Sequence, residues 1–521
     1  MTTKPSVKAT LRELPMRTAR AFVHALEADR ARLWWMLWLF VAALIVRVHW
    51  NTEVHPLHEF LYSDMRGYAQ RADQILDKPY ATQEYSAFFP FGTAWIVAAA
   101  KWGFGRHDWQ SIGKLFALMG ALIVPMCYSI ADRTMGERVG WVAPVVGLVM
   151  VVYYPLIGIG SYVLSELPFA FFLTAALFFL VRLMDEGKHA DAWMVGIMLG
   201  IGTTVRSQMT ASIALFGLAW LITRILPWRA KAEQRIWPKL TWAKMIQVGI
   251  PLALILGASA VRFHLHTGRY GLVSENSGIN LVFGRCHNKG IYSRPDGQGH
   301  GTVRFAPPPL IQLEVYSRDN PDSWLNMDPV FGDFPDPPPD VPGFRLDNLG
   351  CAKRGCILEG GEVEYQGYIG DQELQRRLVK HCIEVGGWGR QVKYSAQHLV
   401  MLWKYTQMWP DQANPRPHPK DKNEGWKALG ELWAKLHRWF LMVPALCSLL
   451  FAFAPRRRPK EAVVAINLWA LLFVAAIWLG EVRFRVPYDP FIVLLAIFGY
   501  GFVWEQARER IRAWRAKRKA G

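Results

Sequence analysis

The stretch Tyr62-Ser63-Asp64-Met65-Arg66-Gly67-Tyr68 lies just after the first strongly apolar run of the chain, Leu33 to Trp50. If that run crosses a membrane outward, Asp64 lies in the first external loop, close to the membrane surface. A carboxylate at that position is well placed to accept a proton from a hydroxyl group. Asp64 could also cap the amphipathic segment that follows it, because a carboxylate accepts hydrogen bonds from the first turn of a helix. The two roles are compatible.

Long apolar runs recur along the whole chain. Hydrophobic residues make up 52% of the 521 residues, and they gather into runs close to the about 20 residues that cross a hydrocarbon core. The pattern predicts an all-α polytopic membrane protein. We expect ten spans, at about residues 33–50, 112–131, 139–156, 167–183, 192–207, 209–226, 245–263, 439–454, 462–479 and 487–504.

The distribution of positive charge predicts the topology. The net charge is +18, and the basic residues concentrate in the two tails and in short connections between apolar runs. This distribution is typical of the positive-inside rule, so we expect no nucleic-acid partner and two cytoplasmic tails. Two cytoplasmic tails require an even number of crossings. The apolar run from Ala87 to Gly103 would be an eleventh, and we therefore expect it to lie along the outer surface.

These spans divide the chain into five parts. The predicted parts are a basic cytoplasmic tail (1–32), a seven-span module with its first external loop at 51–111 (33–263), an extracytoplasmic segment of mixed structure (264–438), a three-span module (439–504) and a second basic tail (505–521).

The extracytoplasmic segment is polar and rich in proline in its first part. From about 371 to 409 its apolar residues have helical spacing, and Gly386-Gly387 interrupts it, which predicts two surface helices. Its four cysteines suggest one or two disulfides in an oxidising compartment, with four free thiols as the alternative. These cysteines are Cys286, Cys351, Cys356 and Cys382. Cys351 and Cys356 do not have zinc-finger spacing and no matching pair of histidines lies near them, so we expect no metal there.

Several charged residues fall where the positive-inside rule does not expect them. These external residues near span ends are Arg206, Arg262, Arg269, Arg483, Arg485, Asp64 and Glu166. Ionisable groups at membrane depth usually mark a site or a pair, and the arginine fork suits a phosphate. As a set they predict a phosphate-bearing ligand reached from the membrane. Alternatively, each arginine pairs with a local acid or a lipid head group, and Glu166 simply caps its span.

Six patches, in this order, resemble motifs of the GT-C glycosyltransferases, and within them the bacterial relatives of protein O-mannosyltransferases and lipid A aminoarabinose transferases (glycosyltransferase family 39-like). The patches are the acidic first-loop motif at Asp64 to Tyr68, Phe89 to Ala94, the second acidic motif at Tyr162 to Phe169, Gly196 to Arg206, Gly268 to Gly284, and Glu481-Val482-Arg483-Phe484-Arg485-Val486-Pro487. The insertion at 289–361 has no counterpart in the family pattern.

The resemblance implies inverting transfer of a sugar from a polyprenyl-phosphate donor to an acceptor hydroxyl. Asp64 would be the general base, and Glu166 would position the acceptor or share that role. Arginines would bind the donor phosphate, and further residues would bind substrate. The implied phosphate ligands are Arg483, Arg485 and Arg206, and the implied substrate contacts are Tyr68, Arg269 and Asn280. Such enzymes usually need no metal or cofactor, and the acceptor could be a lipid, a glycan or a protein.

Other functions remain open at this point. A lipid-linked oligosaccharide ligase or polymerase would share the topology. A lipid or solute transporter usually has paired half-repeats and polar groups at mid-depth, neither of which stands out here. A structural membrane protein would leave Asp64, Glu166 and the external arginines unexplained. On resemblance, we expect a multi-pass protein of a bacterial inner membrane with its site facing the exterior.

Overall fold

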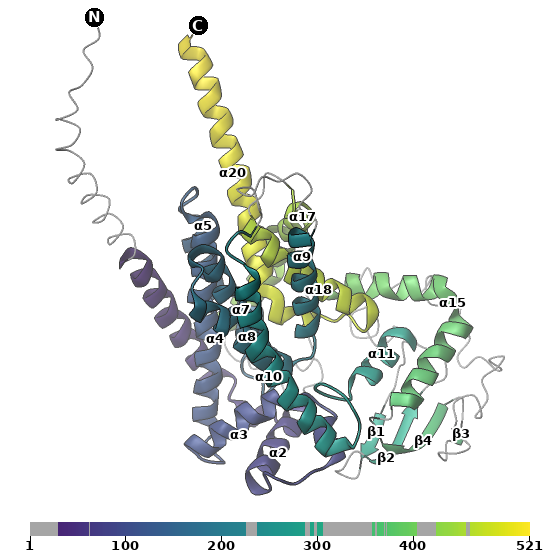
Figure 1. Ribbon diagram of the computed structural model, residues 1–521. Helices are drawn as coiled ribbons and strands as arrows, with labels where there is room; N and C mark the ends of the chain where they lie inside the picture. Colours follow the sequence, from purple (N-terminus) through teal and green to yellow (C-terminus); the bar gives the residue numbers. More distant parts are fainter. Residues whose placement is uncertain are drawn as a thin grey trace, which may run out of the picture.

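The computed structural model describes residues 30–61, 63–225, 237–286, 292–295, 300–305, 357–359, 362–368, 370, 372–403, 424–454 and 459–520. Helices dominate these residues and form an elongated bundle (Figure 1). Within this described part of the chain, seven helical segments are long and apolar enough to cross a membrane. They are Arg30–Val54, Trp109–Gly136, Glu166–Glu186, Trp242–Thr267, Gly425–Phe451, Pro459–Ile477 and Val482–Arg518. The spanning part of the fold is therefore that of an all-α, multi-pass membrane protein, as expected.

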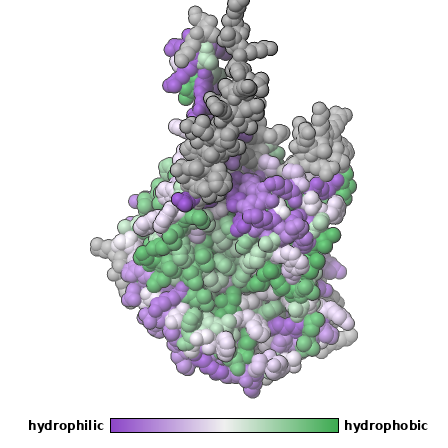
Figure 2. All heavy atoms as spheres, turned by 60° about the vertical axis from the view of Figure 1, so that its left-hand side comes forward, coloured by the Kyte–Doolittle hydropathy of each residue, from purple (hydrophilic) through white to green (hydrophobic). Residues whose placement is uncertain are grey.

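The surface of the bundle fits this description. Figure 2 shows a broad hydrophobic band between hydrophilic zones above and below it. On the first helix Leu33, Trp38 and Ile45 are each more than 60% exposed. Large apolar side chains gathered in a band would be costly in water, and lipid is the solvent that suits them.

The expected count of ten spans is not confirmed. Three of the expected spans are occupied by shorter helices, namely α5 (Val142–Val151), α8 (His189–Val205) and α9 (Met209–Ile225). α5 has 10 residues and is followed by the separate short helix α6 (Tyr154–Ile159). α8 and α9 have 17 residues each, at the lower limit for crossing a hydrocarbon core. Apolar runs in the sequence overestimate helix length where the chain turns.

Small residues allow the central helices to pack closely. α7 (Glu166–Glu186) lies beside α8, and α8 packs along α10 (Trp242–Thr267). A Cβ atom on Gly196 would lie 2.1 Å from the Val248 carbonyl oxygen, and one on Gly200 would lie 2.8 Å from Ile255. Only glycine fits at such contacts between membrane helices. This packing fixes the position of the C-terminal end of α8, and Arg206 is the next residue.

Two helices close the lower end of the bundle in Figure 1, α2 (Ser63–Asp77) and α3 (Gly92–Phe104). α3 has 13 residues, so it is about 20 Å long and too short to span a bilayer. This agrees with the expectation that the run from Ala87 to Gly103 does not cross. The buried Lys101 ammonium binds both carboxylate oxygens of Asp73 at 2.8 Å and thereby joins α3 to α2.

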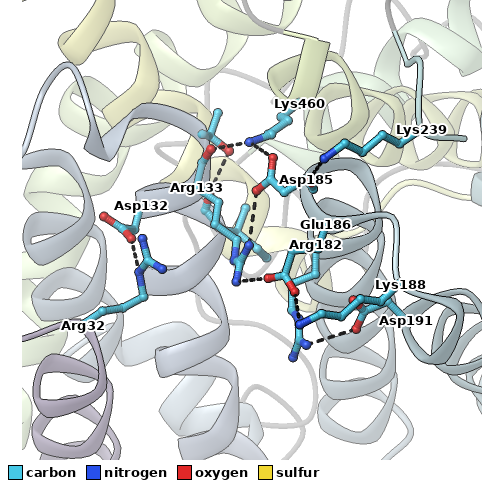
Figure 3. A network of polar contacts seen from close by, with 12 residues as sticks. Arg32, Asp132, Arg133, Arg182, Asp185, Glu186, Lys188, Asp191, Lys239 and Lys460 are labelled. Carbon is cyan, nitrogen blue, oxygen red and sulfur yellow. Dashed lines mark hydrogen bonds and ion pairs between the residues drawn. The ribbon is translucent and has the colours of Figure 1, made fainter. Parts of the chain in front are cut away.

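A network of ion pairs lies at the C-terminal end of α7, around Asp185 and Glu186 (Figure 3). Arg133 approaches Glu186 at 2.7 Å and Asp185 at 3.4 Å, and Lys460 also binds Asp185. The further pairs are Arg32–Asp132, Lys188–Glu186 and Arg182–Asp191. These contacts tie together the first helix, η4 (Asp132–Gly136, which follows α4, Trp109–Ala131), α7, α8 and α18 (Pro459–Ile477). The first helix begins and α20 (Asp489–Ala520) ends at this side of the bundle.

The segment between the two spanning modules contains a small sheet and a bent helix. Its strands form an antiparallel sheet in the order β1-β2-β4-β3, and they are β1 (Tyr292–Pro295), β2 (His300–Phe305), β3 (Ile357–Glu359) and β4 (Glu362–Tyr368). α15 (Gln372–Leu402) packs on α11 (Ser277–Cys286) and bends at Gly387, whose φ of 71° and ψ of 160° are not helical. The expected break at Gly386-Gly387 is thus observed.

The remaining elements of the described residues are α16 (Glu424–Leu436), α17 (Val443–Phe451), α19 (Val482–Arg485), η1 (Trp50–Val54), η2 (Leu57–Phe60), η3 (Glu84–Ala87), η4 (Asp132–Gly136), η9 (His437–Met442) and η10 (Val486–Tyr488).

The predicted disulfides concern residues that are not described. Cys351 and Cys356 lie outside the described residues, and so do the side chains of Cys286 and Cys382. Their pairing stays a prediction, and so does the five-part division of the chain. Most of the insertion at 289–361 also lies outside the described residues.

Candidate active site

Arg483 joins the two acids that the sequence singled out. Its Nη2 atom donates to Asp64 Oδ2 at 3.1 Å, and its Nε atom donates to Glu166 Oε1. Asp64 is in the first turn of α2, Glu166 begins α7, and Arg483 is in the short helix α19. Three segments that are far apart in the sequence therefore meet at one guanidinium group.

Arg206 adds a second positive charge to the same carboxylate. α8 ends at Val205, and Arg206 takes an extended conformation with φ −147° and ψ 124°. Its Nη1 atom lies 2.8 Å from Glu166 Oε1, the oxygen that Arg483 also binds. The Phe484 ring lies 5.1 Å from the Arg206 guanidinium and covers it. Both arginines therefore converge on Glu166.

Aromatic packing holds α19 in register with α7. Tyr488, in the turn after α19, packs edge-on against Phe169 with ring centroids 5.6 Å apart, and both side chains are fully buried. Phe169 lies one turn into α7, on the same side as Glu166. This contact places Arg483 next to Glu166.

Burial differs among the four charged groups. The exposed fraction of the side chain is 0% for Glu166, 10% for Arg206, 14% for Arg483 and 31% for Asp64. Buried ion pairs often give little net stability because both partners lose water. Charged groups at membrane depth are therefore retained chiefly for function. Asp64 is the most accessible of the four and the best placed to meet a substrate.

Glu481 is a third acid near Arg483. It precedes α19 as its N-cap residue. Removal from water raises the pKa of the Glu481 carboxyl, and the positive charge of Arg483 opposes this increase. Sequence reasoning quoted Glu481 within a motif without giving it a role. Its position two residues before Arg483 could have indicated that it belongs to the same cluster.

Tyr68 lies one turn beyond Asp64 on α2 and is 4% exposed. Burial raises the pKa of its hydroxyl, which also interacts with Ser165 next to Glu166. The hydroxyl therefore stays protonated at neutral pH and can donate a hydrogen bond. Tyr68 thus belongs to the same cluster as Asp64.

Arg485 lies in a separate buried network. Its Nε atom donates to Asp489 Oδ1 at 3.0 Å, its Nη1 atom donates to the Leu402 carbonyl at 3.2 Å, and Tyr153 donates to Asp489 Oδ2 at 2.8 Å. Arg485 and Asp489 have no exposed surface. These contacts link α15, α19 and α20. A phosphate-binding role for Arg485 stays a prediction that nothing here tests.

Arg269 and Asn280 lie on the segment after α10. Arg269 pairs with Glu275 at 2.6 Å and with Glu84. Asn280 is in α11, where its backbone N–H donates to the Asn276 carbonyl at 3.2 Å. Their expected substrate contacts also stay predictions. Within the described part of the chain, no group of three or more His, Cys, Asp or Glu side chains is arranged to hold a metal ion.

Residues 32–267, a little under half of the chain, match the family model described as dolichyl-phosphate-mannose-protein mannosyltransferase. No curated protein matches the sequence. Among solved structures, the archaeal oligosaccharyltransferase AglB from Archaeoglobus fulgidus, in complex with an inhibitory peptide and a dolichol-phosphate, has 13% identity and a TM-score of 0.43. The alignment covers 94% of this chain and 52% of AglB, so the chain spans about half the length of that protein.

ArnT from Cupriavidus metallidurans bound to undecaprenyl phosphate has 15% identity and a TM-score of 0.35, with 90% of this chain and 77% of ArnT covered. The apo state of ArnT has 14% identity and a TM-score of 0.33. The family match includes Asp64, Glu166 and Arg206 and ends before Arg483. It agrees, for this part of the chain, with the resemblance to the protein O-mannosyltransferase group.

Proposed function

We propose that this protein is an inverting glycosyltransferase that moves a sugar from a polyprenyl-phosphate donor to an acceptor hydroxyl on the extracytoplasmic side of a bacterial inner membrane. The observation that carries the proposal is the contact of Arg483 with both Asp64 and Glu166. It puts an accessible carboxylate beside two buried arginines. A base and a phosphate site must lie this close together for such a transfer.

Asp64 is the proposed general base. Its carboxylate takes the proton of the acceptor hydroxyl while the hydroxyl oxygen forms a bond to the anomeric carbon of the sugar. The bond between that carbon and the phosphate oxygen breaks on the opposite face, so the anomeric configuration inverts. Polyprenyl phosphate leaves with the bonding electron pair as an anion. A positioned base contributes about 10²- to 10⁴-fold to such a step.

Arg483 and Arg206 are the proposed ligands of the donor phosphate. Charge develops on the phosphate oxygens as the sugar leaves, and guanidinium groups held in a water-poor site stabilise that charge strongly. Glu166 balances the two arginines when no donor is bound. Tyr68 is a proposed hydrogen-bond donor to substrate. Arg485 would then act as a positioning residue, because its pair with Asp489 anchors the helix turn that carries Arg483.

The proposal is tested with purified protein and synthetic polyprenyl-phosphate sugars, using membrane extract as the source of acceptor. Wild type is expected to transfer radiolabelled sugar, and Arg483→Gln is expected to lose about 100-fold or more in rate. Arg66→Gln is the matched control, since Arg66 is exposed on α2. Folding of each variant is checked by thermal melting. An absence of transfer from every donor, with wild type folded, would contradict the proposal and favour a ligase or a transporter.

A further inference from the structure

Arg71 is a buried arginine for which the account so far gives no function. It lies on α2, and the residue is 8% exposed. Its Nε and Nη2 atoms have no hydrogen-bond partner among the described residues. Burying donor groups of a charged side chain without partners is costly. The arrangement therefore calls for a ligand.

Aromatic rings hold the guanidinium of Arg71 by its face. The Phe89 ring centroid lies 4.2 Å from the guanidinium carbon, and the Tyr68 ring centroid lies 5.1 Å from it. Such cation–π contacts fix the plane of the group. Its guanidinium also forms a hydrogen bond with the Tyr85 side chain, which leaves the Nε and Nη2 groups available. Gly67 provides the space, because a Cβ atom there would lie 3.1 Å from Arg71 Nη2.

Arg262, on α10, brings a second positive charge to the same place. Its Nη2 atom donates to the Ser86 carbonyl at 3.0 Å, its guanidinium carbon lies 4.4 Å from the Phe91 ring centroid, and its Nη1 atom has no partner among the described residues. Arg71 and Arg262 interact electrostatically. Both therefore border one short segment, residues 85–91.

The described ion pairs include no carboxylate bound to Arg71 or to Arg262. Two like charges that repel each other in a water-poor site are stabilised by an anion placed between them. Tyr85 and Phe89 are half-buried and lie beside Arg71, so the outer rim of the site reaches the surface. Phosphate and carboxylate groups fit the free edge of an arginine.

We propose that Arg71 and Arg262 form a second anion-binding site, separate from Arg206 and Arg483, which takes a phosphate or carboxylate group of the acceptor. The assignment to the acceptor rests on the proposed function. Arg71 is seven residues beyond Asp64 on α2, so their Cα atoms lie on the same helix face about 10 Å apart. The Arg71 guanidinium reaches back to Gly67, so the acceptor would carry its anion on the same side of α2 as the hydroxyl that Asp64 deprotonates.

Phosphate binding tests the site without any transfer reaction. The melting temperature of the detergent-purified protein is measured against sodium phosphate, with sodium chloride at equal ionic strength as the reference, because a ligand of the folded state raises the melting temperature. A second arm uses nanodiscs of phosphatidylcholine with or without phosphatidylglycerol. This arm distinguishes a lipid head group from a free phosphate. The variants are Arg71→Gln, Arg262→Gln, Gly67→Ala, Arg483→Gln and the exposed control Arg66→Gln.

We expect phosphate or phosphatidylglycerol to stabilise wild type, Arg66→Gln and Arg483→Gln. In Arg71→Gln and Arg262→Gln the apparent dissociation constant should be about tenfold weaker or more, as for the loss of one charge-assisted contact. Gly67→Ala keeps the charge and displaces the guanidinium by about a few tenths of an ångström, so it should weaken binding by a smaller factor. Absence of stabilisation in wild type, wild-type affinity in both Arg71→Gln and Arg262→Gln, or loss of stabilisation in Arg483→Gln alone would overturn the inference. Loss of transfer with intact phosphate binding would instead overturn the proposed function.

Discussion

Arg206 and Arg483 bind the same oxygen atom, Oε1 of Glu166. One arginine follows the end of α8 and the other lies in α19, so a single carboxylate joins the N-terminal spanning module to the C-terminal one. The contact also gives the two carboxylates of the cluster different surroundings. Glu166 holds the two arginines together, and Asp64, at the edge of the cluster, is the group with the greatest exposure.

Removal of the Glu166 charge should destabilise the protein. In Glu166→Gln two buried arginines lose their shared partner, and uncompensated buried charges cost about 3 kcal/mol or more in the free energy of unfolding. The measurement is the melting temperature in detergent. The double variant Glu166→Gln/Arg206→Gln should regain part of the loss, because it removes one of the two positive charges that shared Glu166. Equal stability of Glu166→Gln and wild type would show that Glu166 does not balance the arginines.

Lys101 should position Asp64 through the contact between α3 and α2. Lys101→Met removes its bonds to both Asp73 oxygens, and a small displacement of α2 should lower kcat about tenfold with little change in KM. Lys101→Arg should restore most of the rate. Arg106→Gln is the control, because the Arg106–Asp77 pair is exposed and worth little. A loss in Arg106→Gln as large as that in Lys101→Met would contradict this role.

His398 should make stability depend on pH in the weakly acidic range. The side chain is buried in α15, where Nε2 bonds to the Gly284 carbonyl at 3.1 Å, and burial lowers its pKa from 6.5 to about 4. Between these two values the unfolded chain binds a proton that the folded chain does not, so stability falls as the pH falls from about 6.5 toward 4. Between pH 7.5 and 5 the melting temperature of His398→Gln should decrease less than that of wild type. An identical decrease in both proteins would contradict the prediction.

Gly196 should be needed for the close approach of α8 and α10. In Gly196→Ala the added Cβ atom would lie 2.1 Å from the Val248 carbonyl, so the helices must separate and Arg206 must move. We expect a loss of about 1–3 kcal/mol in stability and a lower transfer rate. Gly257→Ala on α10 is the control, since a Cβ atom there meets nothing within 4 Å. Wild-type melting of Gly196→Ala would show that the helices do not pack this closely.

The sequence predicted the class of fold and singled out charged residues, four of which the structure brings into contact. Asp64, Glu166, Arg206 and Arg483 stood out because charges near span ends are unusual. Which of them share a contact could not be read from the sequence, since the contact of Arg206 with Glu166 depends on how α7 and α8 pack.

Other features of the structure could not be predicted because they depend on local turns of the chain. Arg483 and Arg485 look equivalent in the sequence, but positions two apart on a helical turn point about 200° apart. One therefore meets Glu166 and the other meets Asp489. Arg71 was overlooked because a basic residue on an amphipathic helix is usually exposed. The signal that could have found it is Gly67, one turn earlier. One of the ten expected spans is not confirmed where α5 ends and α6 begins, because hydropathy does not register a turn between two apolar segments.

The most direct test of the account is the transfer rate of Asp64→Asn, because this substitution keeps the shape of the side chain and removes its ability to accept a proton. The rate is measured with purified protein, a synthetic polyprenyl-phosphate sugar and membrane extract, alongside thermal melting and the control Asp77→Asn on the same helix. The account predicts unchanged melting, wild-type transfer by Asp77→Asn, and a rate for Asp64→Asn about 100-fold or more below wild type. Transfer by Asp64→Asn within a few-fold of wild type would contradict it and move the base to another group.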